Sequence, residues 1–362
     1  MNDVVRLGVI GVGDVAQRDY LPEVGRLEPE AVVVAVAGSG AGRVHDIADH
    51  LGVAAHVGYS SLLADSGIDA VLNLTPAQVH EEINTAALAA GKHLYSEKPL
   101  AMTAAAARTL GATAAARGLV LAAAPSVLVY PQIGIVQEEL ASGTLGPAVA
   151  CSSAMFGGVP PWEGFMSDPT HYFAEGIGPL VDIGVYPLHA LTGMLGPVRT
   201  VSAAGRRTRD AFEIVDGPFK GQRVAVEEDD LSILALTFEN GVLGTVQSSF
   251  ASAPGTEPEL EILCERGTVA CSLFDPTAPV RVGDGSDRTE RATPAEREDG
   301  PDHILGVRHL VRCIQGEARP ILTADHAAHV LDVIEAARRS RIEERSVEIP
   351  GQTWRPSEGV RT

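Results

Sequence analysis

The sequence has few cysteines, few positive charges and no long apolar run, and each shortage argues against a class of protein. Its four cysteines lie far apart without a C-x-x-C pair, so we expect reduced thiols, with neither a metal site nor a disulfide framework. Lys and Arg number 28 against 47 Asp and Glu, a net charge of −19, which argues against a basic face for nucleic acid or an anionic membrane. No run reaches the ~18 apolar residues of a membrane span, and no basic leader comes first, so we expect a cytoplasmic protein.

Over the first 124 residues, short apolar runs typical of strands alternate regularly with stretches typical of helices. The 362 residues suggest two domains, at roughly 100–200 residues each. Short apolar runs lie at residues 6–11, 31–38, 70–75, 92–97 and 119–124, and helix-like stretches at 14–27, 43–51, 77–90 and 103–117. This pattern predicts an α/β domain over residues 1–124, with a doubly wound parallel sheet covered by helices on both faces.

Strands predominate in the second predicted domain, residues 125–362. We expect strands at 147–156, 198–205, 222–238, 242–250, 258–265 and 267–273, a polar surface loop at 283–300, and helices at 131–142, 302–315 and 324–341. The prediction is an α+β domain with a large open sheet, mainly antiparallel, and with terminal helices that can pack back on the first domain. An uncovered sheet face is an aggregation hazard, so we expect a homodimer or homotetramer to bury it.

A glycine-rich turn follows the first apolar run. Gly11, Gly13 and Ala16 stand in G-x-G-x-x-A spacing, with Asp14 and Val15 at the expected start of a helix. Gly11 allows the tight turn, Gly13 lets the backbone approach a pyrophosphate, and Ala16 keeps helix and strand close. The pattern predicts dinucleotide binding; the alternative is a purely structural turn.

The second apolar run ends without the carboxylate that would bind a ribose 2′-hydroxyl. Ser39 can instead bond a 2′-phosphate, and Arg43 can neutralise its charge. The cofactor is therefore NADP or NAD, with NADP favoured. The alternative is a flexible loop with Arg43 solvated on the next helix.

Two more loops follow apolar runs at the carboxyl edge of the predicted sheet, where ligands bind in open α/β sheets. We expect Thr75, Pro76, Glu97 and Lys98 to line the cofactor there. His80 either contacts the cofactor or is an imidazole on a helix surface. Beside a nicotinamide, Lys98 can hold the substrate oxygen or exchange a proton with it; alternatively, it is an exposed lysine in a turn.

Four motifs give the chain a resemblance to a known family. "GVGDVA", "LTPAQVH", "AGKHLYSEKPLA" and "GPLVDIGVYPLHAL" occur in the order and spacing of the Gfo/Idh/MocA oxidoreductases. The resemblance implies a Rossmann domain, then an α/β domain with a large open sheet. It also implies alcohol–ketone chemistry on sugars, polyols or related small molecules with NAD or NADP.

The last motif contains Asp182, Tyr186 and His189, which would share one face of a helix at i, i+4 and i+7. Pro187 suits only a first turn, so the helix is expected to begin near Gly184 and Asp182 can instead cap it. In the family, the position of Tyr186 is often a histidine that acts as acid and base. With a tyrosine at this position, the chain resembles the branch of the family that contains glucose–fructose oxidoreductase and dihydrodiol dehydrogenases. The change from histidine leaves open whether Tyr186 or Lys98 is the proton donor. His189 either contacts substrate or packs in the helix.

The segment 157–173 is rich in turns and aromatic residues. Its rings can form an apolar wall of the substrate pocket, a part of the core or a subunit interface; the candidate substrate contacts are Trp162, His171 and Tyr172. We expect a dehydrogenase or reductase in which Lys98 polarises the oxygen, Tyr186 or Lys98 exchanges the proton and Asp182 orients the substrate. The alternatives are an NAD-dependent glycosidase of the same family and a non-catalytic cofactor-binding sensor.

Overall fold

The computed structural model describes residues 4–162, 164–166, 168–255, 259–283, 287–297, 300–351 and 354–356. The chain divides into two compact units. Unit 1 comprises Met1–Ser126 and Asp302–Ala328, and unit 2 comprises Val127–Pro301 and His329–Thr362. Each unit is described by itself.

Unit 1 contains a six-stranded sheet whose neighbours all run parallel, in the order β3-β2-β1-β4-β5-β6. The strands are β1 Val5–Ile10, β2 Ala31–Gly38, β3 Ala54–Val57, β4 Ala70–Asn73, β5 His93–Ser96 and β6 Leu121–Ala123. The predicted doubly wound parallel sheet is confirmed. The short edge strand β3 is absent from the predicted runs because its residues are half-buried or exposed and its sequence, AAHV, has no apolar run.

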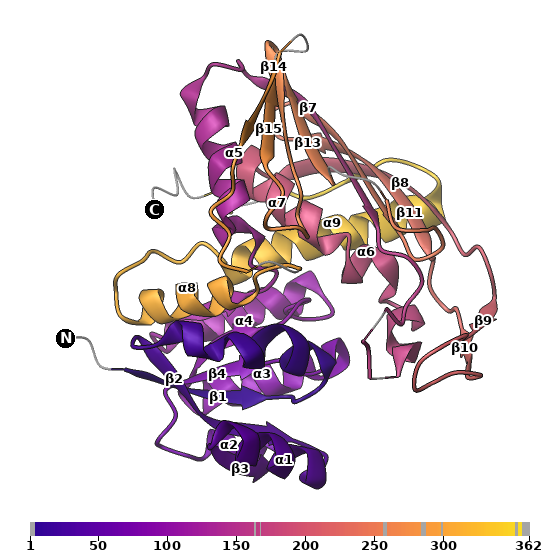
Figure 1. Cartoon of the computed structure of the whole chain (residues 1–362). Coiled ribbons are helices and arrows are strands. Elements are labelled where there is room, and N and C mark those ends of the chain that lie inside the picture. Colours follow the sequence, from indigo (N-terminus) through magenta and orange to yellow (C-terminus); the bar gives the residue numbers. More distant parts are fainter. Residues whose placement is uncertain are drawn as a thin grey trace. The chain divides into compact units, whose positions relative to one another are not determined.

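Helices cover the sheet of unit 1 (Figure 1). They are α1 Ala41–Leu51, α2 Tyr59–Leu63, α3 His80–Ala89, α4 Ala104–Ala116 and, from far along the chain, α8 Ile304–Ile314, which packs on β5 and β6. The helix predicted over 14–27 differs: it consists of a π turn, Ala16–Tyr20, followed by a 3₁₀ segment, Leu21–Leu27. Pro22 lies in the first turn of the 3₁₀ segment and cannot donate a hydrogen bond to the turn before it.

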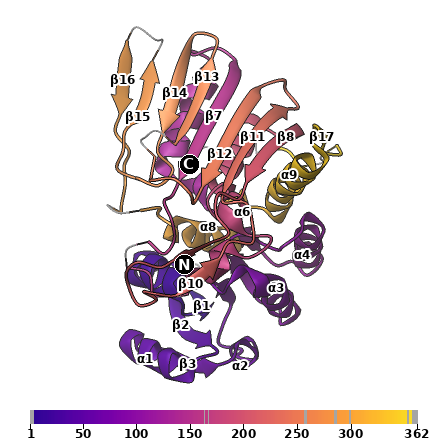
Figure 2. The same cartoon turned by 90° about the vertical axis from the view of Figure 1, so that its right-hand side faces the viewer.

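Unit 2 contains a nine-stranded sheet, seen nearly face-on in Figure 2, in the order β16-β15-β14-β13-β7-β12-β11-β8-β17. Its strands are β7 Ala148–Phe156, β8 Val198–Arg206, β11 Leu231–Phe238, β12 Leu243–Ser249, β13 Leu260–Cys264, β14 Gly267–Cys271, β15 Val280–Gly283, β16 Arg288–Arg291 and β17 Val347–Glu348. Neighbours are antiparallel except for β7 and β12. The predicted mixed, mainly antiparallel sheet is therefore confirmed.

Among the residues that the structure describes, the helices of unit 2 cover one face of this sheet (Figure 1). They are α5 Pro131–Ser142, α6 Gly178–Asp182, α7 Val185–Leu195 and the later part of α9 Ala324–Glu343. Leu234 and Leu236 of β11 are buried on that face, whereas Ile233 between β8 and β12 is 44% exposed on the other. The alternation along β11 matches a half-covered antiparallel sheet.

Two predictions for this unit were wrong in part. The strand predicted over 222–238 is two strands, because Arg223–Ala225 forms β10 and pairs with β9, Ala211–Glu213, in a separate two-stranded sheet. Asp230 interrupts the run: its carboxylate accepts hydrogen bonds from the backbone and hydroxyl of Thr208. The polar loop predicted over 283–300 contains β16, whose exposed polar residues give no apolar signal; residues 284–286 and 298–299 of that loop lie outside the described residues.

Membrane-spanning helices and clusters of metal-binding side chains are both absent from the described residues. Among them, no helix has the length and apolar character needed to cross a bilayer. Within the same residues, no group of three or more His, Cys, Asp or Glu side chains is arranged to hold a metal ion.

Candidate functional site

The glycine turn lies at the centre of the sheet of unit 1, where the strand order reverses between β1 and β4. Gly11 follows β1 with φ of +95°, and a Cβ there would lie 2.7 Å from the Leu74 carbonyl at the end of β4. The position therefore requires glycine twice, for its conformation and for the close approach. A Cβ at Gly13 would meet no atom within 4 Å, and Ala16 is fully buried against the sheet. These three positions fit the dinucleotide turn: one shapes it, one leaves open space and one packs.

The loop after β2 presents both residues predicted to select the cofactor. Ser39 and Arg43 are exposed, and Arg43 lies in the first turn of α1. That turn has no acidic residue, and its N-cap, Gly40, contributes no side-chain hydrogen bond. The side chain of Arg43 makes no hydrogen bond or ion pair to any residue that the structure describes. The loop thus offers a cation and a hydroxyl to solvent and no carboxylate.

The loops after β4 and β5 belong to unit 1 and are connected through His80, the first residue of α3. His80 is 1% exposed, which overturns the alternative of an imidazole on a helix surface. Its Nδ1 lies 2.7 Å from the Pro99 carbonyl oxygen and its Nε2 lies 2.7 Å from the Thr75 carbonyl oxygen. Burial lowers the pKa of His80, although both carbonyls act in the opposite direction. Thr75 is half-buried and Pro76 exposed, at the same edge as the glycine turn.

Glu97 and Lys98 follow β5 directly. Lys98 is half-buried, and the peptide bond to Pro99 is cis. Glu97 is 7% exposed; its carboxylate accepts hydrogen bonds from the Lys98 backbone N–H at 2.8 Å and from the Tyr20 hydroxyl at 2.6 Å. Burial and the neighbouring carboxylate hold the pKa of Tyr20 well above its usual value, so its proton stays available for that bond. Glu97 is thus directed into the unit, and Lys98 is the half-buried cation of the loop.

In unit 2, Asp182 does not share a helix with Tyr186 and His189. Asp182 ends α6, Ile183 and Gly184 form a turn, and α7 begins at Val185. Pro187 has no N–H to donate to the preceding turn, so a continuous helix cannot run through it. The predicted start of the helix near Gly184 is confirmed. The N-cap position of α7 is occupied by Gly184 and not by Asp182.

Tyr186 and His189 are both buried in unit 2. The ring of Tyr186 packs 4.8 Å from that of Phe274, between centroids. His189 is 5% exposed, and burial, with a smaller effect of the nearby His329 imidazole, lowers the pKa of His189 to about 3. Its surroundings favour the alternative of a packed helix histidine. A contact of His189 with substrate stays a prediction.

The aromatic residues of segment 157–173 form a packed cluster in unit 2. Trp162 contacts Phe165, Tyr172 and Phe250 edge to face, with centroid distances of 5.1 to 5.8 Å, and its indole N–H donates to the Gly157 carbonyl. The rings contacting Trp162 are buried, whereas Trp162 itself is half-buried. His171 is also half-buried and lies 3.9 Å from the ring of Tyr172. Roles in substrate binding for Trp162, His171 and Tyr172 stay predictions.

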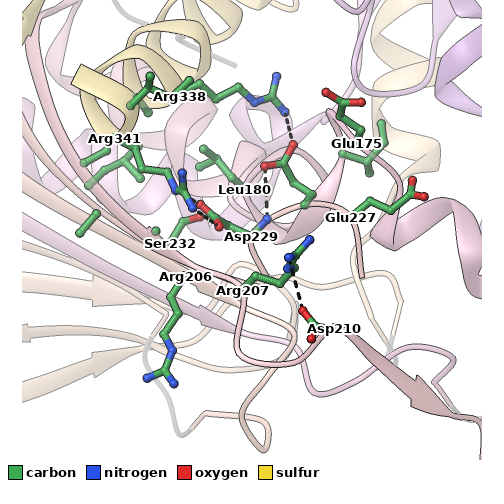
Figure 3. Close-up of a pocket in the computed structure, with 18 residues that line it drawn as sticks. Glu175, Leu180, Arg206, Arg207, Asp210, Glu227, Asp229, Ser232, Arg338 and Arg341 are labelled. Atoms are coloured by element: carbon green, nitrogen blue, oxygen red, sulfur yellow. Dashed lines mark hydrogen bonds and ion pairs between the residues drawn. The ribbon is translucent and has the colours of Figure 1, made fainter. Parts of the chain in front are cut away.

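A cavity of about 690 Å³ lies elsewhere in unit 2, between β8, β11, α9 and the chain before α6 (Figure 3). None of the predicted site residues lines it. Arg341 of α9 forms an ion pair with Asp229, and Arg338 lies 3.8 Å from Glu228. Arg207 is paired with Asp210 at 3.3 Å. Because most of its charges are satisfied by one another, the cavity is not assigned to the chemistry.

Sequence reasoning missed the buried polar residues behind the two loops of unit 1. Three of them are completely buried: Asn73, Asn84 and Ser96. The side chain of Asn73 donates a hydrogen bond to that of Asn84, which in turn donates one to the hydroxyl of Ser96. The only signal for them was the spacing of His80 and Asn84, which stand at i and i+4 and therefore share a helix face. The missing information is the register of β4 against β5, which brings their partners together.

Two family models match the chain. The model described as "Oxidoreductase family, NAD-binding Rossmann fold" matches residues 5–124, and the model described as "GFO/IDH/MocA C-terminal domain" matches residues 135–270. The chain belongs to the Gfo/Idh/MocA oxidoreductase family. The resemblance drawn from the four sequence motifs is thereby confirmed.

Several curated relatives are named as reductases of a dTDP-sugar or as dehydrogenases of inositols. The chain is 37% identical over 215 residues to the dTDP-3,4-didehydro-2,6-dideoxy-alpha-D-glucose 3-reductase of Streptomyces antibioticus. The aligned residues make up 59% of this chain and 64% of the relative. The match to four such reductases therefore spans only about six tenths of their length. The myo-inositol 2-dehydrogenase of Thermotoga maritima is 22% identical, over 95% of this chain and 98% of that protein.

Solved structures of the family show the same fold. A 3-ketoreductase from Actinomadura kijaniata, in complex with TDP-benzene and NADP, has a TM-score of 0.75 at 24% identity over 93% of this chain and 98% of that one. Solved forms of that reductase include variants in which a lysine or a tyrosine is replaced. An oxidoreductase from Agrobacterium radiobacter, with a TM-score of 0.78 at 21% identity over 96% of this chain and 99% of that one, is in complex with NAD+.

Proposed function

We propose that this chain is an NAD(P)-dependent oxidoreductase that transfers hydride between nicotinamide and a carbinol or carbonyl carbon of a sugar, polyol or related cyclic alcohol. The observation that carries the proposal is the position of Lys98, a half-buried cation at the carboxyl end of β5, on the sheet edge that bears the glycine turn. Membership of the family and the substrates of its curated members support it.

The residues of unit 1 fit a dinucleotide. Gly13 leaves open space where the backbone can approach a pyrophosphate, and Gly11 holds the turn against β4. Thr75 and Pro76 follow β4 on the same edge and would flank the cofactor. When bound, the nicotinamide accepts or supplies the hydride.

The chain itself supplies placement, charge and a proton path. In the oxidative direction the substrate hydroxyl loses a proton while its carbon loses a hydride. The Lys98 ammonium would polarise the oxygen while Tyr186, as the phenolate, takes the proton and becomes a phenol; in the alternative, the neutral amine of Lys98 takes the proton and becomes the ammonium. Asp182, at the end of α6, would orient a substrate hydroxyl by accepting its hydrogen bond.

The first prediction concerns Lys98. Lys98→Ala should lower turnover by at least about 10²-fold, the usual contribution of a proton-transferring group, while cofactor binding persists. Absorbance of reduced nicotinamide measures turnover with candidate aldoses and ketones, and a thermal shift with cofactor measures binding. Lys220→Ala, at an exposed lysine of unit 2, is the matched control.

The same assay separates the alternatives. Net change of the nicotinamide absorbance with an aldose or ketone supports the oxidoreductase. Cleavage of a glycoside without net change would indicate the glycosidase, and binding without either reaction would indicate a sensor. Full activity of Lys98→Ala would remove the lysine from the mechanism.

We also propose that NADP is preferred over NAD. The loop after β2 has no carboxylate to bind a 2′-hydroxyl and presents Ser39 and Arg43 to solvent. A charged hydrogen bond contributes about 1.5–3 kcal/mol, so Arg43→Ala should weaken NADP binding by roughly 10- to 100-fold. Binding of NAD should not change. Titration of both cofactors against wild type, Arg43→Ala and the control Arg206→Ala tests this, and equal loss for the two cofactors would contradict it.

We further propose that the open face of the nine-stranded sheet is covered by a second copy of the chain, in a homodimer or within a homotetramer. The rows that cross β8, β11 and β12 on that face combine apolar side chains, such as Ile233 and Leu243, with small or polar ones, such as Ala204 and Gln247. An open apolar sheet face tends to associate.

A further inference from the structure

Two side chains on α3 each connect the loop after β4 with the loop after β5. His80 and Asn84 stand one helical turn apart on the same face of α3. Both are buried, at 1% and 0% exposure. They bond consecutive carbonyls on the far side of Lys98: His80 contacts that of Pro99, and Asn84 contacts that of Leu100.

On the side of β4, the same two residues bond a second set of partners. The Nε2 of His80 lies 2.7 Å from the Thr75 carbonyl oxygen. Both ring nitrogens thus face acceptors: the neutral ring donates to one of the two carbonyls, and the protonated ring, whose pKa the carbonyls raise and burial lowers, donates to both. The Oδ1 of Asn84 accepts a hydrogen bond of 2.8 Å from the Nδ2 of Asn73. Asn73 in turn accepts hydrogen bonds from the backbone and hydroxyl of Thr75. Thr75 is therefore held from both sides.

The orientation of Asn84 follows from its partners. The Leu100 carbonyl can only accept, at 3.0 Å, so the amide nitrogen of Asn84 must face it. The second N–H of that nitrogen donates to the Ser96 hydroxyl at 2.9 Å. All hydrogen-bonding groups of the Asn84 side chain are used, and a fully satisfied buried network fixes one geometry.

Lys98 lies between residues that are held in this way. Its backbone N–H donates to the Glu97 carboxylate, and the next carbonyl, that of Pro99, contacts His80. The chain before and after Lys98 is thus fixed by side chains from outside the loop. The position of the ammonium then depends on α3 as well as on β5.

We propose that His80 and Asn84 are positioning residues that hold Lys98 and Thr75 in a fixed relation, so that the two loops keep one geometry. The catalytic part of this inference rests on the proposed function, because it takes Lys98 as the group that meets the substrate oxygen. His80 acts through the carbonyls that it contacts and not by touching the cofactor.

Two substitutions of His80 separate its two contacts. Asparagine places its amide nitrogen near the Nδ1 position and so keeps a donor to Pro99, whereas glutamine places its nitrogen near the Nε2 position and keeps a donor to Thr75. His80→Gln should therefore displace Lys98, and His80→Asn should spare Lys98. Asn84→Asp keeps the acceptor toward Asn73 but removes both donors, so it should displace Lys98 as well.

The first readout requires no turnover. The sequence has only three lysines, Lys92, Lys98 and Lys220. Reductive methylation with ¹³C-formaldehyde therefore gives a simple NMR spectrum of methylated lysines, and the Lys98 signal is identified as the one that is missing in Lys98→Ala. We expect the Lys98 signal to change in shift or linewidth in His80→Gln and Asn84→Asp, and to match wild type in His80→Asn. Controls are His93→Gln, at the opposite end of β5, and Asn240→Asp in the turn after β11. An unchanged Lys98 signal in folded His80→Gln and Asn84→Asp would overturn the proposal.

The second readout uses turnover at saturating cofactor. A misplaced catalytic group costs about 10²-fold in rate, so kcat should fall by that order in His80→Gln and Asn84→Asp. His80→Asn should instead weaken cofactor binding, because the Thr75 side is released. In a Lys98→Arg background the loss caused by Asn84→Asp should shrink; an undiminished loss would mean that Asn84 acts elsewhere. If no substrate is turned over, the proposed function fails, and the ¹³C signal still decides whether His80 and Asn84 hold Lys98.

Discussion

At the scale of single residues, the two glycines of the turn have different roles. Gly11 has φ of +95° and lies against the Leu74 carbonyl, whereas Gly13 faces open space. Glycine is therefore required at position 11 by the fold of unit 1, and at position 13 by the ligand that approaches the turn. Their spacing in the sequence is identical in a structural turn and in a binding turn, so the structure is needed to distinguish them.

This difference predicts opposite phenotypes. Gly11→Ala should destabilise the protein by about 1–3 kcal/mol or more, because an L-residue is strained at this φ and its Cβ would collide with backbone. Gly13→Ala should leave stability within about 0.5 kcal/mol, as for a substitution without contacts, but should weaken cofactor binding. Chemical denaturation measures the first effect and cofactor titration the second. A Gly13→Ala protein that binds cofactor like wild type would disprove a pyrophosphate contact at that position.

The residues that the sequence revealed are those with a local pattern. Gly11 and Gly13 were recognisable from their spacing, and Lys98 from its place after an apolar run. The partners of Glu97 were not, because Tyr20 is 77 residues away and reaches it only through the folded sheet. Asn73 and Asn84 gave no separate signal, since a buried asparagine network depends on strand register and not on composition.

At the scale of elements, the break between α6 and α7 shows how two local rules compete. The i, i+4, i+7 spacing of Asp182, Tyr186 and His189 indicates one helix, whereas Pro187 requires a new start. Proline prevails because it has no N–H for the carbonyl of Ile183 and its ring would clash with that carbonyl in a continuous helix. Asp182 therefore belongs to a different helix from Tyr186, and its orientation is set by α6 and by the turn at Ile183 and Gly184.

Strands were predicted well where one face is buried and poorly where both are exposed. The regular alternation of β11 marks it clearly, with Leu234 and Leu236 inside and Ile233 outside. The edge strands β3 and β16 were missed because few of their side chains are buried. The pairing order of the nine strands was beyond the sequence, since contacts between distant strands leave no periodic signal.

The open sheet face gives a prediction at this scale. Ile233 is 44% and Leu243 58% exposed, so replacing both by lysine should leave the fold intact and abolish association through that face. Sedimentation equilibrium should find an oligomer in wild type and a smaller species in the double variant. Val215→Lys, at a residue 80% exposed outside the sheet, is the control and should match wild type. A monomeric wild-type protein would refute the proposed oligomer.

At the scale of the whole molecule, each unit contains a buried histidine that is kept neutral. Burial lowers the pKa of His189 in unit 2 to about 3 and that of His309 in unit 1 to about 4. His309 must be neutral to accept the hydrogen bond from the Ile321 backbone N–H at its Nε2. Both units therefore carry a group that binds a proton more readily when the chain unfolds.

This arrangement predicts acid sensitivity in both units. An unfolded histidine titrates near pH 6.5, so between pH 6.5 and the folded pKa the unfolded state binds more protons and stability falls as the pH falls. Each histidine should contribute up to about 1.4 kcal/mol per pH unit, over pH 6.5 to 3 for His189 and 6.5 to 4 for His309. Thermal unfolding at constant ionic strength should show a nearly constant Tm above pH 7 and a decline below 6.5. His189→Gln and His309→Gln should each flatten the decline, since glutamine does not titrate and can still accept a hydrogen bond. A variant with the pH dependence of wild type would show that its histidine is not the group responsible.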